Sequence, residues 1–141
     1  MRIVLDTNIL LVSFSERSVS HWVVDAFKKK KFELAYTTEI LQEYEEKFGE
    51  HWSVQMAELV VTTILKLPNT VQTTVYYKLN LITHDEDDNK FADCAFASNA
   101  NYIVTNDTDF DVLKKIDFPV IQVISLKEFK QILLDRNLLQ P

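Results

Sequence analysis

Short apolar runs alternate along this chain with longer segments of helical periodicity, and this alternation limits the fold more than any other feature of the sequence. The strand-like runs cover residues 2–5, 32–36, 102–105 and 119–123, with residues 71–76 as a further strand or an extended edge. Helical patterns cover residues 9–14, 18–30, 51–66, 88–99 and 125–134, together with a segment that begins at Thr38. Strands that alternate with helices are typical of a parallel sheet covered on both faces. We therefore predict an α/β fold with a central, mainly parallel sheet of about five strands.

Length and composition place the chain among single-domain globular proteins. Its 141 residues, 47% hydrophobic and 26% charged, suffice for one core, so we predict a single domain over residues 1–141. The single glycine argues against nucleotide-binding loops, which need several glycines for the backbone to approach phosphate. The single cysteine, Cys94, excludes an internal disulfide and a cysteine-based zinc cluster.

Hydropathy and charge bear on location and partners. No apolar run approaches the roughly 20 residues that span a bilayer, and the start of the chain lacks a secretory pattern, so we expect a cytoplasmic protein. The formal net charge of −6 weighs against nucleic-acid binding, which usually relies on a basic surface. That objection weakens if several acids are gathered around divalent cations, because bound metal reverses the local field.

Two acids follow predicted strands. Asp6 comes directly after the run 2–5, and Asp107 comes two residues after the run 102–105. Ligands of open parallel sheets bind outside the carboxyl ends of the strands, near the point where the strand order reverses. The two side chains are therefore candidates for one shared pocket. The alternative is that each acid caps the helix after it, and for either residue alone that alternative is favoured.

Asp88 favours the shared pocket because it lies on the inward face of its predicted helix. Apolar residues follow it at positions i+3, i+4 and i+7, namely Phe91, Ala92 and Ala95. Capping alone does not require that orientation. Asp93, at i+5, points away from Asp88 and fits either an outer acid of the site or a surface residue. The acids just before Asp88 fit a solvated loop: Asp85, Glu86 and Asp87.

Glu43 flanks the apolar stripe of its predicted helix on one side, and Glu45 flanks it on the other. Spacing alone favours a solvent-exposed acidic face for both residues.

Converging carboxylates imply a cation. They repel one another, so some of them must bind protons unless a metal ion neutralises them. Carboxylate oxygens suit Mg²⁺ and Mn²⁺, and such an ion lowers the pKa of a bound water and stabilises charge on a phosphate. The pattern therefore favours metal-assisted phosphodiester chemistry.

With these residues in view, the chain resembles the PIN-domain family, and within it the stand-alone bacterial proteins classed as toxin components of toxin–antitoxin systems. Residues 3–10 look like the family's first motif, a strand that ends in a metal-binding Asp, here Asp6. Residues 87–95 resemble the third motif, with Asp88 as the metal ligand, and residues 102–107 the fourth, with Asp107 as the acid. Residues 37–43 align with the weaker second motif, which makes Glu43 the family's Glu.

The resemblance implies a three-layer α/β/α sandwich and Mg²⁺- or Mn²⁺-dependent endonucleolytic cleavage of single-stranded or loop RNA. The implied catalytic and metal-binding residues are Asp6, Glu43, Asp88 and Asp107, with Thr7, Asn8, Thr105 and Asp93 in support. The resemblance also implies an antitoxin protein as partner and a homodimer. Aromatic residues that fit either a dimer interface or the core are Trp22, Trp52, Tyr76 and Tyr77. Asn106 stands where many relatives have glycine, and asparagine tolerates unusual backbone angles nearly as well.

Two other classes of function compete with a ribonuclease. A non-catalytic RNA-binding or protein-interaction module on the same fold is favoured slightly by the negative charge. A phosphoacceptor receiver domain also places acids at strand ends, but it needs an acidic pair after the first strand and a lysine near the last. Here Thr7 follows Asp6, and Ser125 follows the last run.

Overall fold

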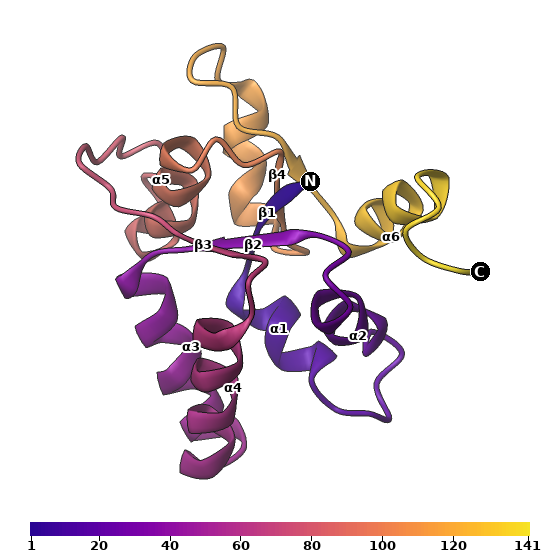
Figure 1. Cartoon of the computed structure of the whole chain (residues 1–141). Coiled ribbons are helices and arrows are strands. Elements are labelled where there is room, and N and C mark those ends of the chain that lie inside the picture. The colour runs from indigo at the N-terminus through magenta and orange to yellow at the C-terminus, as the bar shows by residue number, and fades with distance from the viewer.

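Five parallel strands form the central sheet in the computed structural model, which describes all of residues 1–141. The strands are β1 (Arg2–Leu5), β2 (Glu33–Tyr36), β3 (Thr70–Gln72), β4 (Tyr102–Val104) and β5 (Val123–Ile124). They lie in the order β3-β2-β1-β4-β5 (Figure 1), and every neighbouring pair is parallel. Strands of such a sheet are covered on both faces, which is why Ile3, Val4 and Leu5 of β1 are apolar in succession and almost fully buried.

The strand order reverses between β1 and β4. From β1 the chain adds β2 and β3 on one side, and it then crosses over to add β4 and β5 on the other. Leu5 pairs with Val104 across this reversal point, so the residues that follow them leave the sheet where ligands of such folds bind. Receiver-type sheets have the order 2-1-3-4-5 instead, so the receiver alternative is excluded.

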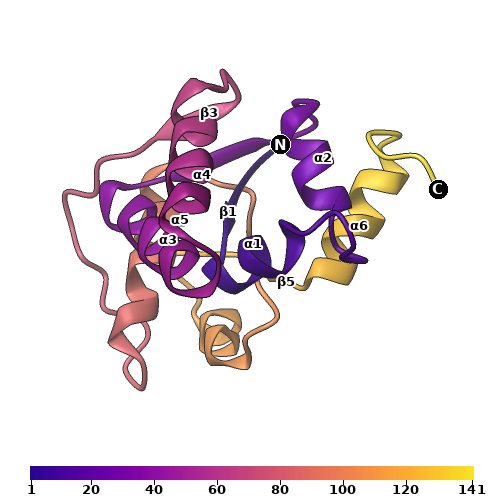
Figure 2. The ribbon, with the colours of Figure 1, turned by 90° about the horizontal axis from the view of Figure 1, so that it is seen from below.

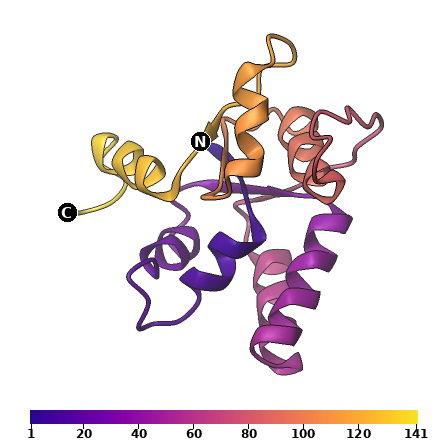
Figure 3. The ribbon, with the colours of Figure 1, turned by 180° about the vertical axis from the view of Figure 1, so that it is seen from behind.

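Helices cover both faces of the sheet, which confirms the predicted three-layer arrangement (Figures 1 and 3). One face carries α1 (Thr7–Ser13), α2 (Trp22–Lys28), α3 (Thr38–His51) and α4 (Val54–Lys66). The other face carries α5 (Asn89–Ala97), which the 3-10 turn η1 (Glu86–Asp88) precedes, and the 3-10 helix η2 (Thr108–Lys115). The last helix, α6 (Leu126–Asp135), lies beside α2 (Figure 2). None of these helices combines the length and the apolar character needed to cross a bilayer.

Several boundaries differ from those predicted. Thr37, not Thr38, caps α3, because its hydroxyl accepts the Ile40 N–H at 3.2 Å. Residue 51 ends α3, and α4 begins only after Ser53, whose hydroxyl accepts the Met56 N–H at 3.0 Å. The last strand covers residues 123–124 rather than 119–123, since only Val123 and Ile124 pair with β4. The ambiguous run 71–76 contributes the edge strand β3, over residues 70–72.

Aromatic side chains from both helical layers fill the core. The fully buried ones are Tyr44, Phe48, Phe91, Phe110 and Phe129. The Tyr44 hydroxyl donates a hydrogen bond of 2.6 Å to the carbonyl oxygen of Leu5, the last residue of β1. This bond fixes α3 against the end of β1, directly before Asp6.

Candidate active site

Asp6 follows β1 directly, and its carboxylate does not cap α1. The backbone N–H of Asp6 continues the sheet by donating to the Val104 carbonyl at 3.1 Å. The side chain makes no capping hydrogen bond to α1; instead, Oδ2 accepts one from the Thr105 hydroxyl at 2.8 Å. Only 6% of the residue is exposed. The Thr105 hydroxyl therefore holds the Asp6 carboxylate, with at most a weak contact to the Asn8 backbone, and an open pocket borders it.

Asp107 caps a helix and also lies beside Asp6. Its Oδ1 accepts the Asp109 N–H at 2.9 Å and so caps η2. Its own N–H donates to the Thr105 hydroxyl oxygen at 2.9 Å, and that hydroxyl donates in turn to Asp6. Asp6 and Asp107 line one open pocket of about 340 Å³ together with the exposed residue Asn8. Thr105, itself buried, thus connects two acids that share a pocket.

Glu43 points from α3 toward the same region. Its Oε2 accepts a hydrogen bond from the hydroxyl of Thr7, and its Oε1 lies 2.7 Å from the ammonium of Lys90. The Glu43 side chain is 14% exposed, whereas Glu45 faces solvent. The tertiary structure therefore distinguishes two glutamates that sequence spacing could not. Burial by itself would lower the pKa of Lys90, but hydrogen bonds to Asp87 and Glu43 raise it overall.

Asp88 has the least satisfied carboxylate of the four predicted acids. It stands at the start of α5 but makes no capping hydrogen bond, and its Oδ2 is buried without any hydrogen-bond partner. Its neighbour Asp87 is instead an exposed residue that pairs with Lys90 at 2.8 Å. Asp88 thus points inward, and Asp87 does not.

Burial and neighbouring acids raise the pKa values of Asp6 and Asp88. The pKa of Asp88 is raised to about 7, first by burial and then by the charges of Asp85, Asp107 and Asp6. Burial also raises the pKa of Asp6; the Thr105 hydrogen bond opposes this shift, and the charges of Asp107 and Glu43 add to it. The fold therefore gathers acids whose ionised forms need a compensating positive charge.

The residues present fit a divalent metal ion. All four acids offer hard oxygen ligands of the kind that Mg²⁺ and Mn²⁺ prefer. A buried acceptor without a partner, such as Asp88 Oδ2, is costly unless a donor or a cation meets it. Asp85 and Asp109 add to the donor set, because their ligand atoms and one of Asp88 lie within 4.8 Å of one another. Asp88 is thus shared by two groups of acids.

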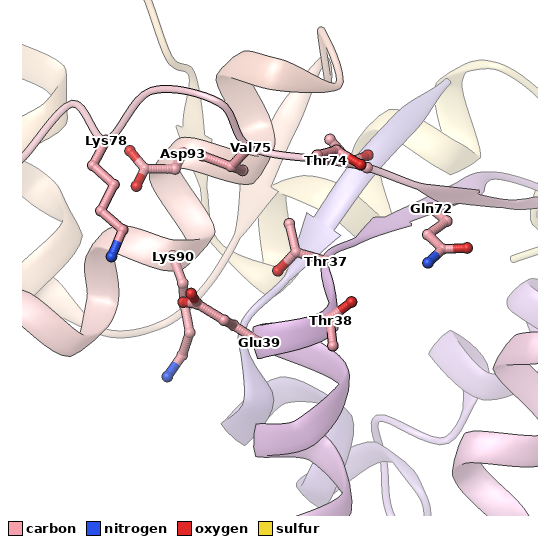
Figure 4. A pocket seen from close by; sticks show the side chains of 10 residues that line it. Thr37, Thr38, Glu39, Gln72, Thr74, Val75, Lys78, Lys90 and Asp93 are labelled. Carbon is pink, nitrogen blue, oxygen red and sulfur yellow. The ribbon is translucent and has the colours of Figure 1, made fainter.

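Asp93 lies in a different pocket from the four acids. It is 6% exposed, so it is not a surface residue, and its Oδ1 accepts the Leu79 N–H at 3.1 Å. It lines a polar cavity of about 200 Å³ next to the start of α3, together with Lys78 and Lys90 (Figure 4). Burial raises its pKa. Asp93 makes no hydrogen bond with Asp88, although Lys90 borders both regions.

Three residues near the site were missed by the sequence analysis. Lys90 offered one signal, since it stands three residues after Asp87 on a helix start, at a spacing that favours ion pairs. Asp109 follows Asp107 at i+2, and Asp85 looked like one acid of a solvated loop. The contact of Lys90 with Glu43 joins residues 47 positions apart, so no local pattern reveals it.

Comparison with protein families identifies the chain. A family model described as PIN domain matches residues 2–109. The chain belongs to the PIN domain family. All four candidate acids of this PIN domain, from Asp6 to Asp107, lie inside the matched region.

Solved structures show the same fold as this PIN domain. The crystal structure of VapBC2 from Rickettsia felis, bound to a DNA fragment from their promoter, matches with a TM-score of 0.62. The match covers 89% of this chain and 98% of that chain at 19% sequence identity, so it shows a shared fold. Comparison with curated protein sequences gave no significant match.

Proposed function

We propose that this PIN domain is a divalent-metal-dependent endoribonuclease that cleaves single-stranded or loop RNA. The observation that carries the proposal is the buried, unpaired Oδ2 of the Asp88 carboxyl, whose pKa is raised by burial and by the charges of nearby acids that include Asp107 and Asp6. Asp6 and Asp107 themselves follow β1 and β4, between which the strand order reverses. The donor atoms of these three aspartates are all carboxylate oxygens. Such a set suits Mg²⁺ or Mn²⁺ better than an organic cofactor.

Four residues would form the catalytic and metal-binding set, with three in supporting positions. Asp6, Asp88, Asp107 and Glu43 would hold the ion, which when bound supplies an activated water and stabilises charge on the phosphate. The Thr105 hydroxyl orients Asp6, and the Thr7 hydroxyl orients Glu43. Asn8 lines the open pocket beside Asp6, where an RNA strand can approach.

Cleavage of a fluorescently labelled RNA that contains a hairpin loop and a single-stranded tail tests the proposal. We expect cleavage with Mn²⁺ or Mg²⁺ and none in EDTA. Asp6→Asn removes one negative ligand from the site and should reduce cleavage by about 100-fold or more. Asp117→Asn is the matched control, since Asp117 is exposed and lies outside the site. Cleavage at the wild-type rate in EDTA, or by Asp6→Asn, would refute the proposal.

A second candidate function is a non-catalytic RNA-binding or protein-interaction module. The net charge of −6 favours it, because phosphate contacts usually come from basic surfaces. Binding of Mn²⁺ without cleavage of any RNA in a varied substrate set would select this candidate.

We further propose that the ribonuclease is the cytoplasmic toxin of a toxin–antitoxin pair, with an antitoxin protein as its partner. Support comes from the motif resemblance and from the shared fold with VapBC2. Induced expression in a bacterium should arrest growth, whereas expression of Asp6→Asn should not.

We also propose a homodimer, with Tyr76 and Tyr77, each 83% exposed, as candidate interface residues. Trp22 is not a candidate, because its ring packs against that of Phe129. Light scattering, which measures the mass of the protein in solution, tests the dimer.

A further inference from the structure

Glu43 differs from the other three acids of the site because the protein already neutralises it. One of its oxygens accepts from Thr7, and the other is paired with the Lys90 ammonium at 2.7 Å. Asp6, Asp88 and Asp107 have no lysine, arginine or histidine nitrogen within 4.0 Å. The carboxylates that lack a positively charged partner are therefore those of the three aspartates, and not that of Glu43.

Lys90 is held firmly in place. Its ammonium contacts Asp87 at 2.8 Å as well as Glu43, and it lies 5.9 Å from the centre of the Phe91 ring. The side chain is only 13% exposed, so water screens the Lys90–Glu43 pair far less than a surface ion pair. Lys90 also follows Asp88 by two residues, and the same backbone segment therefore fixes both the least satisfied acid and the ammonium.

A divalent ion bound to Glu43 would stand close to this ammonium. Both charges are positive, and the half-buried position strengthens their repulsion. A metal ion and Lys90 thus compete for the same carboxylate, whereas an ion among Asp6, Asp88 and Asp107 meets no such competitor.

We propose that the Lys90 ammonium takes the place of a second metal ion at Glu43, so that the chain binds one divalent ion, held by aspartates around Asp88 and not by Glu43. Lys90 is then a positioning residue that orients Glu43, and Glu43 is not a direct metal ligand. This inference rests on the proposed metal-dependent function and removes Glu43 from the four metal ligands proposed with it.

Counting bound Mn²⁺ by calorimetric titration and electron paramagnetic resonance tests the inference without any cleavage assay. We expect one Mn²⁺ per wild-type chain. Lys90→Gln frees Glu43 and removes a positive charge, so this variant should bind two ions and bind the first more tightly. Lys90→Arg keeps the charge and should bind one. Lys78→Gln is the matched control, since Lys78 lines the neighbouring cavity (Figure 4) without any carboxylate partner, and it should also bind one.

Mn²⁺ binding by Glu43→Gln gives a second test, which does not depend on the folding of the Lys90 variants. If Glu43 is not a ligand, this variant should still bind one Mn²⁺, with its Kd weakened by about 10- to 100-fold, as for residues outside the first coordination sphere. Asp88→Asn should lose the ion.

The outcomes separate this inference from the proposed function. Two ions in the wild-type chain, one ion with unchanged Kd in Lys90→Gln, or loss of the ion in Glu43→Gln would each overturn the role of Lys90 alone. Absence of Mn²⁺ binding by the wild-type chain would overturn both the role of Lys90 and the metal-dependent function.

Discussion

At the scale of single residues, the three aspartates of the site differ in what contacts their oxygens. Thr105 donates to Asp6, the Asp109 N–H donates to Asp107, and Asp88 Oδ2 receives nothing. A carboxylate oxygen that is buried without a hydrogen-bond partner lowers the stability of the folded protein when the aspartate is ionised. Asp88 is therefore the residue at which the proposed function opposes stability most directly.

The pKa of Asp88 gives a prediction for the metal-free protein. Its value rises from an ordinary 3.8 to about 7 in the folded state, so the folded chain keeps a proton that the unfolded chain has lost. Stability should thus fall as pH rises from about 4 to about 7, with the full loss present above that window. Asp88→Asn removes this loss. In EDTA at pH 8 the variant should have a higher Tm than the wild type, with little difference near pH 4.

Thermal unfolding followed by circular dichroism measures this effect. Asp117→Asn, at an exposed position, should leave Tm unchanged at both pH values. A lower Tm for Asp88→Asn at pH 8 would show that the Asp88 carboxylate is satisfied in the folded protein.

At the scale of elements, the site depends on how α3 meets the end of β1. The fully buried Tyr44 of α3 donates to the Leu5 carbonyl, one residue before Asp6. Since Glu43 precedes Tyr44, this bond sets where the Glu43 carboxylate lies relative to Asp6. The hydroxyl of Thr7, in the first turn of α1, then donates a hydrogen bond to Glu43.

Tyr44→Phe tests this connection between elements. The change removes one hydrogen bond and leaves a buried carbonyl with one donor fewer, which should cost about 1 kcal/mol or more of unfolding free energy. RNA cleavage per folded molecule should fall as well, because α3 loses its fixed position. Urea unfolding and the cleavage assay measure the two effects. Tyr102→Phe, at the half-buried start of β4, is the control and should change neither.

At the scale of the whole molecule, the site and the far end of the core are separate. The candidate acids come from the ends of β1 and β4 and from the starts of α3 and α5. The start of α6 reaches the site, because the Leu126 N–H donates to Asn106 Oδ1 at 3.1 Å. By contrast, the fully buried Phe129 of α6 packs against Trp22 and Phe32, with ring distances of 5.8 Å and 5.3 Å, and Phe32 precedes β2 at the end of the strand opposite the acids.

Phe129→Ala should therefore lower stability without changing the site. Truncation of a fully buried phenylalanine costs about 3–5 kcal/mol of unfolding free energy. Below the unfolding transition, Mn²⁺ affinity should stay that of the wild type. Phe118→Ala is the matched control, because Phe118 is 83% exposed and should change stability by less than about 0.5 kcal/mol. A large loss of Mn²⁺ affinity in Phe129→Ala would show that α6 supports the site.

Much of this organisation could be predicted from the sequence, because it depends on local patterns. The alternation of strands and helices gave the layered parallel sheet, and the position of Asp6 and Asp107 after apolar strands placed them at one edge of it. The apolar residues that follow Asp88 showed which way its side chain faces. Each of these inferences needs only the periodicity of a helix or a strand.

Only the tertiary structure decided the rest. Whether an acid after a strand caps the next helix depends on what else its oxygens meet, and this differs between Asp6 and Asp107. Glu43 and Glu45 flank the same apolar stripe, and the packing of α3 on β1 selects one of them. The ion pair of Lys90 with Glu43 joins distant segments, so the balance of charge in the site follows from the packing of α3 against α5. A sequence pattern determines which way a side chain faces on its own element, but the contacts that set its charge and its partners arise only when elements meet.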